Sequence, residues 1–326
     1  MGFNEKWINL IMLCVKTVTY SILINDEPRG LIHLTRGIRQ GDPLSPFLFL
    51  LCTEGLNGLI KHVERNGDIH GFSLCRRGPK LTHLLFADNS LLFCRSTKEE
   101  CDKVLKILES YERASGQKVN RDKTSLFFSK CIPPNTKTNI MCVLGVQEIF
   151  HYEKYLGLPS LVGKGKKTSF NYIKERDWQK LQGGREGKLL SQAKREVLIK
   201  AVIQAIPTYT MGCFKIPLGL LCQDIESLIK KIWWGQRGER RKIHWVRWEE
   251  MTKAKMEGGM SFRDLALYND SLLAKQVWRL IHNKSSLFYK VFKVRFFPNC
   301  TLMEATDTRY GSYVWRSILK GRDVLQ

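Results

Sequence analysis

The sequence predicts an α+β protein in which strands alternate with helices over the first half and helices dominate the second half. The stretch TVTYSILI (Thr17–Ile24) is rich in β-branched and aromatic residues, and the turn residues Asn25–Gly30 separate it from LIHL (Leu31–Leu34). Two further short apolar runs, THLLF and SLLFC, lie on either side of the sequence Ala87-Asp88-Asn89. Each pair of runs predicts an antiparallel hairpin, and the second hairpin is expected to carry Asp88 and Asn89 at its tip.

Two helices of the first half are predicted from their end signals and apolar spacing. Ser45 and Pro46 begin the strongly apolar segment FLFLLCTEGLNGLIKHV, and this apolarity predicts a helix in the core. Thr97 and Glu100 form a capping box for the next helix, which Gly116 ends. That helix is expected to cover one face of the sheet.

The strand pattern fades after about Tyr155, and apolar residues then recur at helical spacing, as they do over residues 189–202 before Pro207. This change predicts two domains. The first covers residues 1–160, and the second, mainly helical, covers residues 161–326.

The charge balance predicts a polyanionic partner. Fifty-three Lys and Arg against 31 Asp and Glu give a formal net charge of +22. Such a surface binds nucleic acid through phosphate contacts, although a merely soluble basic protein stays open as the alternative. No apolar run is long enough to span a membrane, and the start MGFNEKW lacks a signal-peptide pattern. An intracellular protein is expected, in the nucleus or the cytoplasm without distinction.

Cysteine and tryptophan usage adds two expectations. The ten cysteines include no CxxC pair, so zinc is not indicated, and free, mostly buried thiols in a reducing compartment are expected. Seven of the eight tryptophans lie in the second half among basic residues. That pattern suits base stacking and phosphate contact, while the alternative places most of these rings in the core.

The segment RGIRQGDPLSPFLF (Arg36–Phe49) is the most specific in the chain. Gly41 has no Cβ and allows a ligand to approach the backbone closely, and Gln40 offers both a donor and an acceptor. Pro43 and Pro46 fix the entry into the helix. An ordinary Gly-Pro turn before a helix is the alternative interpretation.

This segment resembles the motif that follows the first catalytic aspartate of reverse transcriptases, and the match is nearly word for word in plant LINE-like (non-LTR) retrotransposons. FADNSLLFC (Phe86–Cys94) is similar to the catalytic hairpin of the same family, which normally carries two adjacent aspartates. The resemblance implies that Gln40 and Gly41 lie by the incoming nucleotide and that Asp88 is a ligand of Mg²⁺. Asn89 stands where the family has its second aspartate.

Two later segments resemble further motifs of the family. SGQKVNRDKTSLFFS places Lys123 where the family has a lysine near the phosphates of the bound nucleotide. KYLGLP resembles the turn that supports the primer end, which implies a primer-grip role for Tyr155, Leu156 and Gly157. The stretches IWWG, RKIHWVRWEEM, KMEGGMSFRDLALYNDSLLAKQVWRLI and YVWRSILKGRDVL look like the region that follows the polymerase in plant LINE-like proteins.

The resemblance implies the palm of a right-handed polymerase, an antiparallel sheet with helices, over residues 1–160. A helical thumb and connection region would follow over residues 161–326. The family's first aspartate motif would precede the region that resembles MGFNEKWINLIMLCV, and a zinc-binding segment and a ribonuclease H domain come later in such elements. A copy truncated at both ends is therefore expected.

Several functions follow from this resemblance. The ancestral activity is RNA-directed DNA synthesis on an RNA template with a primer, deoxynucleotides and Mg²⁺. Without the first aspartate motif, and with Asn89 in place of a carboxylate, the chain alone is expected to be inactive, to bind Mg²⁺ poorly if at all, and to keep its binding to RNA and DNA. One alternative is a domesticated RNA-binding or splicing-helper protein without polymerase activity, and another is an upstream exon that supplies the missing motif.

Overall fold

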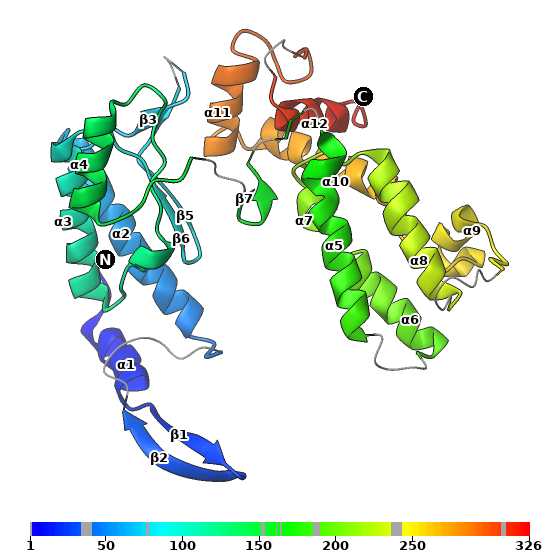
Figure 1. Ribbon diagram of the computed structural model, residues 1–326, viewed down its shortest axis with the longest axis horizontal. Helices are drawn as coiled ribbons and strands as arrows, with labels where there is room; N and C mark the ends of the chain where they lie inside the picture. The colour runs from blue at the N-terminus through cyan, green and yellow to red at the C-terminus, as the bar shows by residue number, and fades with distance from the viewer. Residues whose placement is uncertain are drawn as a thin grey trace. The chain divides into compact units, whose positions relative to one another are not determined.

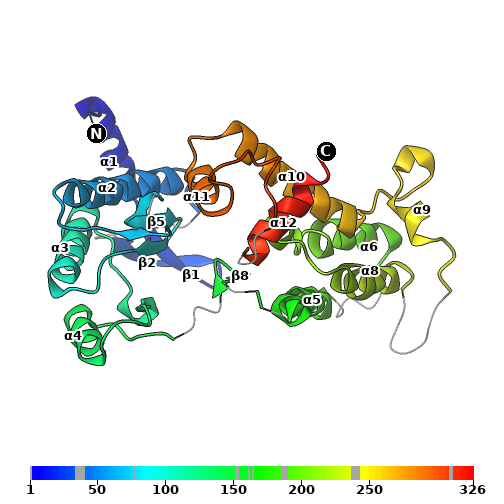
Figure 2. The same cartoon turned by 90° about the horizontal axis from the view of Figure 1, so that it is seen from above.

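Short antiparallel hairpins and helices make up the computed structural model, which confirms the α+β prediction (Figures 1 and 2). The structure describes residues 2–33, 41–75, 78–150, 154–160, 162–163, 165–184, 190–235, 243–307 and 311–326, except for the side chains of 181–184 and 221–223. The chain forms two compact units: unit 1 is Met1–Ser73 with Lys80–His151, and unit 2 is Leu74–Pro79 with Tyr152–Gln326.

Unit 1 combines helices with two-stranded hairpins. Its elements are α1 (Glu5–Lys16), β1 (Thr19–Ile24), β2 (Glu27–His33), α2 (Ser45–Arg65), β3 (Phe72–Ser73), β4 (Lys80–Leu81), β5 (His83–Phe86), β6 (Asn89–Leu92), α3 (Lys98–Ser115), the 3₁₀ turn η1 (Arg121–Lys123) and α4 (Pro134–Leu144). Strand β1 pairs with β2, β3 with β4, and β5 with β6, each pair antiparallel.

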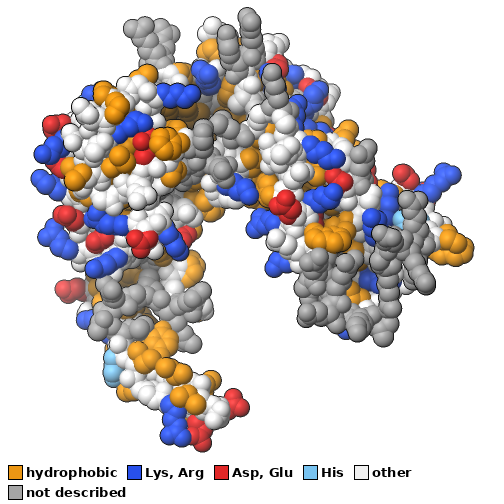
Figure 3. Space-filling model, viewed as in Figure 1, with side chains coloured by type: hydrophobic (Ala, Val, Ile, Leu, Met, Phe, Trp, Pro, Cys, Tyr) orange, Lys and Arg blue, Asp and Glu red, His pale blue; other side chains and the backbone are white. Residues whose placement is uncertain are grey.

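The first hairpin is present but has a tighter turn than the sequence suggested. Asn25 and Asp26 alone form the turn, with φ of 51° and 63°, and β2 already begins at Glu27. Asn and Asp tolerate this left-handed conformation better than other non-glycine residues do. Hydrophobic side chains of this hairpin lie on the surface, at the lower left of Figure 3.

The prediction that the apolar helix lies in the core was wrong for the first half of α2. Leu56 and Ile60 are its buried residues, whereas Phe47 and Leu50 keep 66% and 60% of their surface exposed. A helix is buried only where other elements cover it, and apolarity alone does not supply that cover. In unit 1, α3 and the β5–β6 hairpin pack against the second half of α2.

The helix after the catalytic-hairpin motif begins and ends as predicted. The hydroxyl of Thr97 accepts a hydrogen bond from the Glu100 amide, and Gly116 ends α3 in the left-handed conformation with φ of 71°. Ile107 and Tyr111 of α3 then join Leu56 and Ile60 of α2 in one hydrophobic cluster. Leu85 and Leu92 of the β5–β6 hairpin pack against this cluster, so α3 covers one face of that hairpin.

Unit 2 is helical apart from one short hairpin in its described residues. Its elements are β7 (Lys154–Tyr155), β8 (Leu158–Pro159), α5 (Lys166–Gly184), α6 (Gln192–Leu198), the π-helical turn η2 (Ile199–Ile203), α7 (Thr208–Met211), the π-helical turn η3 (Gly219–Ile225), α8 (Glu226–Trp233), α9 (Trp248–Thr252), the 3₁₀ turn η4 (Lys255–Glu257), α10 (Leu265–His282), α11 (Leu287–Phe296) and α12 (Tyr313–Arg322). One hydrophobic cluster gathers α5, η2, η3 and α8, and a second forms around Trp315 of α12.

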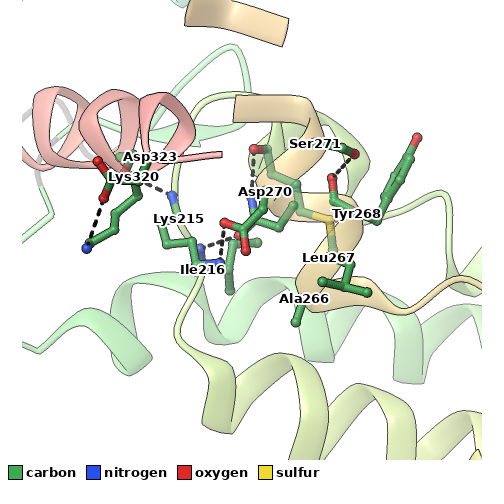
Figure 4. Close-up of polar contacts among 12 residues, drawn as sticks. Lys215, Ile216, Ala266, Leu267, Tyr268, Asp270, Ser271, Lys320 and Asp323 are labelled. Carbon is green, nitrogen blue, oxygen red and sulfur yellow. Dashed lines mark hydrogen bonds and ion pairs between the residues drawn. The ribbon is translucent and has the colours of Figure 1, made fainter. Parts of the chain in front are cut away.

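Helix α10 organises unit 2 through one buried amide. The Asn269 side chain is 0% exposed, accepts a hydrogen bond from the Ile216 amide at 2.9 Å and donates to the carbonyls of Met211 and Phe214. Lys215, next to Ile216 in Figure 4, forms an ion pair with Asp270 at 2.5 Å. These contacts hold the segment after α7 against α10. They also give hydrogen-bond partners to backbone groups that burial would otherwise leave unpaired.

The C-terminal part of α12 also approaches the middle of α10 closely. A Cβ built on Gly321 would lie 2.5 Å from the backbone carbon of Leu273, so only glycine allows this approach. The contact fixes which face of α10 is turned toward α12 and leaves the other face on the surface.

The cysteines are free, but the expectation that most of them are buried was wrong. Nine thiols are described as free, and Cys101 alone of these nine is buried. Cys14, Cys94, Cys131 and Cys142 are exposed. Cys14 and Cys142 lie in α1 and α4, whereas Cys94 and Cys131 lie in loops, and the cysteine count does not reveal these positions. No helix within the described ranges is both long and apolar enough to cross a membrane.

The carboxyl of Asp177 predicts a pH dependence of stability. This α5 side chain is fully buried, and neither carboxyl oxygen has a hydrogen-bond partner among the described residues. Burial raises the pKa of Asp177 from 3.8 to about 8. Because the folded-state pKa is raised, the folded state binds the proton more tightly, and stability is lost as pH rises between about 4 and 8.

We therefore expect Asp177→Asn to raise the midpoint of thermal unfolding by roughly 5 °C or more near pH 8 and to change it little near pH 4.5. The size follows because about 1 kcal/mol of unfolding free energy shifts the midpoint of such a unit by ~2–4 °C. Thermal unfolding followed by circular dichroism at both pH values measures this. Glu175→Gln, an exposed carboxyl in the same helix, is the matched control. An equal effect of Asp177→Asn at both pH values would contradict the assignment.

Candidate functional site

The β5–β6 hairpin carries the two residues of the candidate catalytic motif. Phe86 pairs with Asn89, so Ala87 and Asp88 form the turn and Asn89 is the first residue of β6. Ala87 has φ of 47°, a conformation that costs a residue with a Cβ about 1 kcal/mol or more. Asp88 and Asn89 are both exposed. The prediction placed both at the tip, and the structure has Asp88 in the turn itself and Asn89 directly after it.

The hairpin presents Asn89 on its free face. Residues directly paired in an antiparallel hairpin lie on the same face, and successive residues alternate. Leu85 and Leu92 point to the face that packs on α2 and α3. Asn89 and its partner Phe86 share the other face, and Phe86 is 58% exposed. The packing of the hairpin therefore leaves the Asn89 side chain accessible to a ligand.

The base of the hairpin is fixed to α2 by polar contacts. His83 Nε2 lies 2.9 Å from Asn57 Oδ1, and His83 Nδ1 lies 3.0 Å from the Thr82 hydroxyl. The Phe93 amide donates to the Thr82 carbonyl at 2.8 Å and extends the pairing by one step. Burial, and then the charge of Lys61, lower the pKa of His83, so its ring is neutral at physiological pH.

Glu100 at the start of α3 anchors the chain on both sides of this hairpin. Its carboxylate accepts hydrogen bonds from the amide of Arg95 at 2.9 Å and from the amide and ring Nδ1 of His70 at 3.3 and 2.8 Å. Burial alone would raise the pKa of Glu100, but these hydrogen bonds outweigh it and hold the pKa below its ordinary value. The carboxylate is thus ionised and ties the strand ends to α3.

The tip supplies little negative charge for a metal. Asn89 Nδ2 donates to Asp88 Oδ1 at 3.5 Å, so one carboxylate and one neutral amide lie side by side. No group of three or more His, Cys, Asp or Glu side chains that could hold a metal ion occurs among the described residues. Two-metal phosphoryl transfer uses several carboxylates around two ions. These two side chains by themselves do not fit such a centre.

The other candidate residues of unit 1 lie on loops. Gly41 has φ of 87°, and no described residue lies within 4 Å of a Cβ built on it, so the described part of the chain leaves its backbone open to a ligand. Gln40, the other predicted nucleotide-binding residue, falls outside the described residues. Lys123 ends η1, where its amide donates to the Asn120 side chain at 3.2 Å and its own side chain is exposed. No hydrogen bond joins Lys123 to Asp88 in the described ranges.

The predicted primer-grip residues form the tight hairpin of unit 2. Tyr155 pairs with Leu158, so Leu156 and Gly157 are the turn, with φ of 51° and 78°. Leu158 packs against the main hydrophobic cluster of this unit, and the Lys154 ammonium lies 4.9 Å from the centre of the Tyr172 ring. The turn is therefore packed against the helical part of unit 2, with Gly157 exposed at its tip.

Among the predicted site residues that the structure describes, Asp88 and Asn89 lie together at one hairpin tip, and Tyr155, Leu156 and Gly157 lie together in another turn. Gly41 and Lys123 belong to the same unit, and Tyr155 with its turn belongs to the other. Sequence reasoning missed the anchoring role of Glu100, although its place in the capping box marked it as structured. Nothing in the local sequence indicated the pairing of His83 with Asn57, because the two residues lie 26 positions apart.

A comparison with known protein families shows the family of this chain. The profile of the family described as reverse transcriptase (RNA-dependent DNA polymerase) matches residues 1–173, which is just over half of the 326 residues. The match includes the β5–β6 hairpin and the turn of β7 and β8. The chain belongs to the reverse transcriptase family.

Individual relatives come from Arabidopsis thaliana. An uncharacterised mitochondrial protein is 41% identical over 122 residues, 37% of this chain and 79% of that protein. A putative ribonuclease H protein is 34% identical over 175 residues, 52% of this chain and 27% of that protein. A second uncharacterised mitochondrial protein is 48% identical over 68 residues, 21% of this chain and 56% of that protein. The alignments thus cover between about a quarter and four fifths of these relatives.

The role of Glu100 predicts the local stability of the hairpin. Glu100→Gln replaces an acceptor of three hydrogen bonds with an amide that accepts through one oxygen only, and we expect the opening free energy of the hairpin to fall by about 2 kcal/mol at neutral pH. Hydrogen exchange of the Phe93 amide, measured by mass spectrometry, should then be roughly 30-fold faster.

The contribution of Glu100 to the stability of the hairpin changes with pH in a definite direction. Since the folded-state pKa of Glu100 is lowered, its contribution is present above the ordinary value of 4.5 and is lost as pH falls through the lower folded value. The exposed neighbour Glu99, changed to Gln, is the control and should leave the exchange rate unchanged. Equal protection in both variants at neutral pH would refute the anchoring role.

Proposed function

We propose that this chain is a reverse transcriptase of the plant LINE-like type that binds RNA and DNA but does not polymerise by itself. The observation that supports the loss of polymerase activity is the hairpin tip, where Asn89 takes the place of a carboxylate next to Asp88. We assign residues 1–160 to the palm and residues 161–326 to the thumb and connection region. The helical content of unit 2 and the paired strands of unit 1 support this assignment.

The electrostatics of the tip support the loss of catalysis. A carboxylate ligand neutralises part of the charge of Mg²⁺, whereas an amide oxygen is neutral and a weaker ligand. In the proposed site Asp88 would hold one ion through a single carboxylate. The nucleophile and the leaving group both need a bound ion in this chemistry, so one carboxylate with one amide leaves the transition state poorly stabilised.

The remaining candidate residues fit positions of the ancestral site. Gln40 and Gly41 would lie by the incoming deoxynucleotide, and the open backbone at Gly41 supports this role. Lys123 would approach the nucleotide phosphates, and its side chain is exposed and without a shielding ion pair among the described contacts. Tyr155, Leu156 and Gly157 would support the primer end, in agreement with their position in a tight hairpin turn.

Nucleic-acid binding is supported by charge. The net charge of +22 leaves many cations without a carboxylate partner. One relative is described as a putative ribonuclease H protein, which suggests a nucleic-acid partner for the matched region.

One experiment on the purified chain tests both halves of this proposal. With a primed RNA template, deoxynucleotides and Mg²⁺, we expect binding that weakens steeply between about 50 and 200 mM salt, because bound phosphates release counterions. We expect no extended primer in the same samples. Fluorescence anisotropy measures the binding, and gel electrophoresis of a labelled primer measures the extension.

Two outcomes would overturn the proposal. Affinity that does not change with salt would contradict binding through the basic surface. Primer extension by the wild-type chain that disappears in the Asp88→Ala variant would contradict the loss of catalysis. The variant also serves as a control, because extension by a contaminating polymerase would persist in it.

A further inference from the structure

The tryptophans of unit 2 divide between the core and the surface. Trp233, Trp248 and Trp315 are buried in hydrophobic clusters, as expected of large apolar rings. Trp245 and Trp278 instead keep 76% and 58% of their surface exposed. An exposed aromatic ring beside cations is available to stack on a nucleic-acid base while the cations contact phosphates.

Trp278 lies on one exposed face of α10 together with three other functional side chains. Lys275, Trp278, Arg279 and His282 stand at positions i, i+3, i+4 and i+7, a spacing that places them on the same side of a helix. All four are exposed. The buried residues of α10, such as Leu273 and Val277, point to the opposite side. These four residues are called the α10 face below.

The Trp278 ring is held in a fixed orientation. Its centroid lies 4.0 Å from that of the His282 ring, with an interplanar angle of 27°, so the two rings are stacked. His282 Nδ1 lies 2.9 Å from the Trp278 carbonyl oxygen, and because a carbonyl only accepts, this nitrogen carries the proton and donates. The pair is thus arranged before any ligand arrives, which reduces the entropy lost on binding.

The surroundings of the α10 face are uniformly basic in sequence. Residues 271–303 contain six Lys and Arg and no Asp or Glu. Asp270, which precedes this stretch, is already engaged by Lys215 at 2.5 Å. Lys275 and Arg279 therefore flank an aromatic stack without a carboxylate on their own helix face to neutralise them.

We propose that the α10 face binds single-stranded nucleic acid, with an unpaired base stacked near Trp278 and backbone phosphates held by Lys275 and Arg279. This inference rests on the nucleic-acid binding proposed above and names the surface that performs it. An aromatic ring between cations matches alternating bases and phosphates. A duplex keeps its base faces stacked inside, so it offers only phosphates to this surface.

Variants of the full chain separate stacking from charge. Trp278→Leu keeps an apolar side chain but removes the ring, and we expect roughly 5- to 100-fold weaker binding of a single-stranded RNA oligonucleotide with an unchanged salt slope. Trp278→Phe should restore part of the affinity. Lys275→Gln with Arg279→Gln should instead reduce the slope of log affinity against log salt by about 1.4, the value for two phosphate contacts on a single strand.

The matched control is Trp7→Leu. Trp7 is likewise exposed, at 39%, and stacked on a neighbouring ring, that of Phe3, at 4.4 Å, but it lies in α1 of unit 1. We expect Trp7→Leu to leave RNA affinity unchanged. A double-stranded RNA of the same length should show no difference between wild type and Trp278→Leu, since it has no free base to stack.

The outcomes distinguish the two proposals. If the wild-type chain binds no RNA, the proposed function itself fails. If the wild type binds and Trp278→Leu binds equally well, the proposed function stands and the α10 face is overturned as the binding surface. Equal losses on single- and double-stranded RNA would also overturn the stacking role, because they would show a general effect on charge or folding.

Discussion

Catalysis of nucleotide transfer by metal ions depends on anionic oxygen ligands, and the charge available at the tip of the β5–β6 hairpin limits what this chain can do. The tip offers Asp88 and the neutral amide of Asn89, joined by a hydrogen bond of 3.5 Å. Replacing one carboxylate with an amide alters the volume of the side chain little but removes a full negative charge. Every step that depends on a bound divalent ion is affected, whereas the shape of the hairpin is not.

The hairpin is held by contacts that do not involve its tip. Leu85 and Leu92 pack against α2 and α3, and Glu100 fixes the chain before and after the strands. Because these contacts lie on the buried face and at the base, Asn89 can replace an acidic residue without loss of the fold. Fold and catalysis are therefore separable in unit 1, and an intact hairpin is weak support for activity. The nucleic-acid binding that we propose draws on other parts of the molecule, namely the excess of cations and the exposed aromatic rings.

Local signals predicted the elements whose structure is decided by near neighbours. The hairpin around Asp88 and the cap of α3 at Thr97 depend on residues within a few positions, and both are present. The exposure of Phe47 was not predictable in this way, because it depends on which distant elements cover α2. The same limit applies to Asn269, whose hydrogen bonds reach residues 53 or more positions away. The roles assigned to Lys123 and Tyr155 came from the resemblance and stay predictions.

Loss of catalysis at this hairpin requires that its tip bind divalent ions weakly. Titration of the isotope-labelled chain with Mn²⁺, followed by paramagnetic broadening of the amide signals of residues 86–90, measures this without any need for turnover. We expect no selective, saturable broadening at these residues in the wild type and stronger broadening in Asn89→Asp, which restores the second carboxylate. Selective broadening in the wild type at micromolar Mn²⁺, abolished by Asp88→Ala, would contradict this expectation.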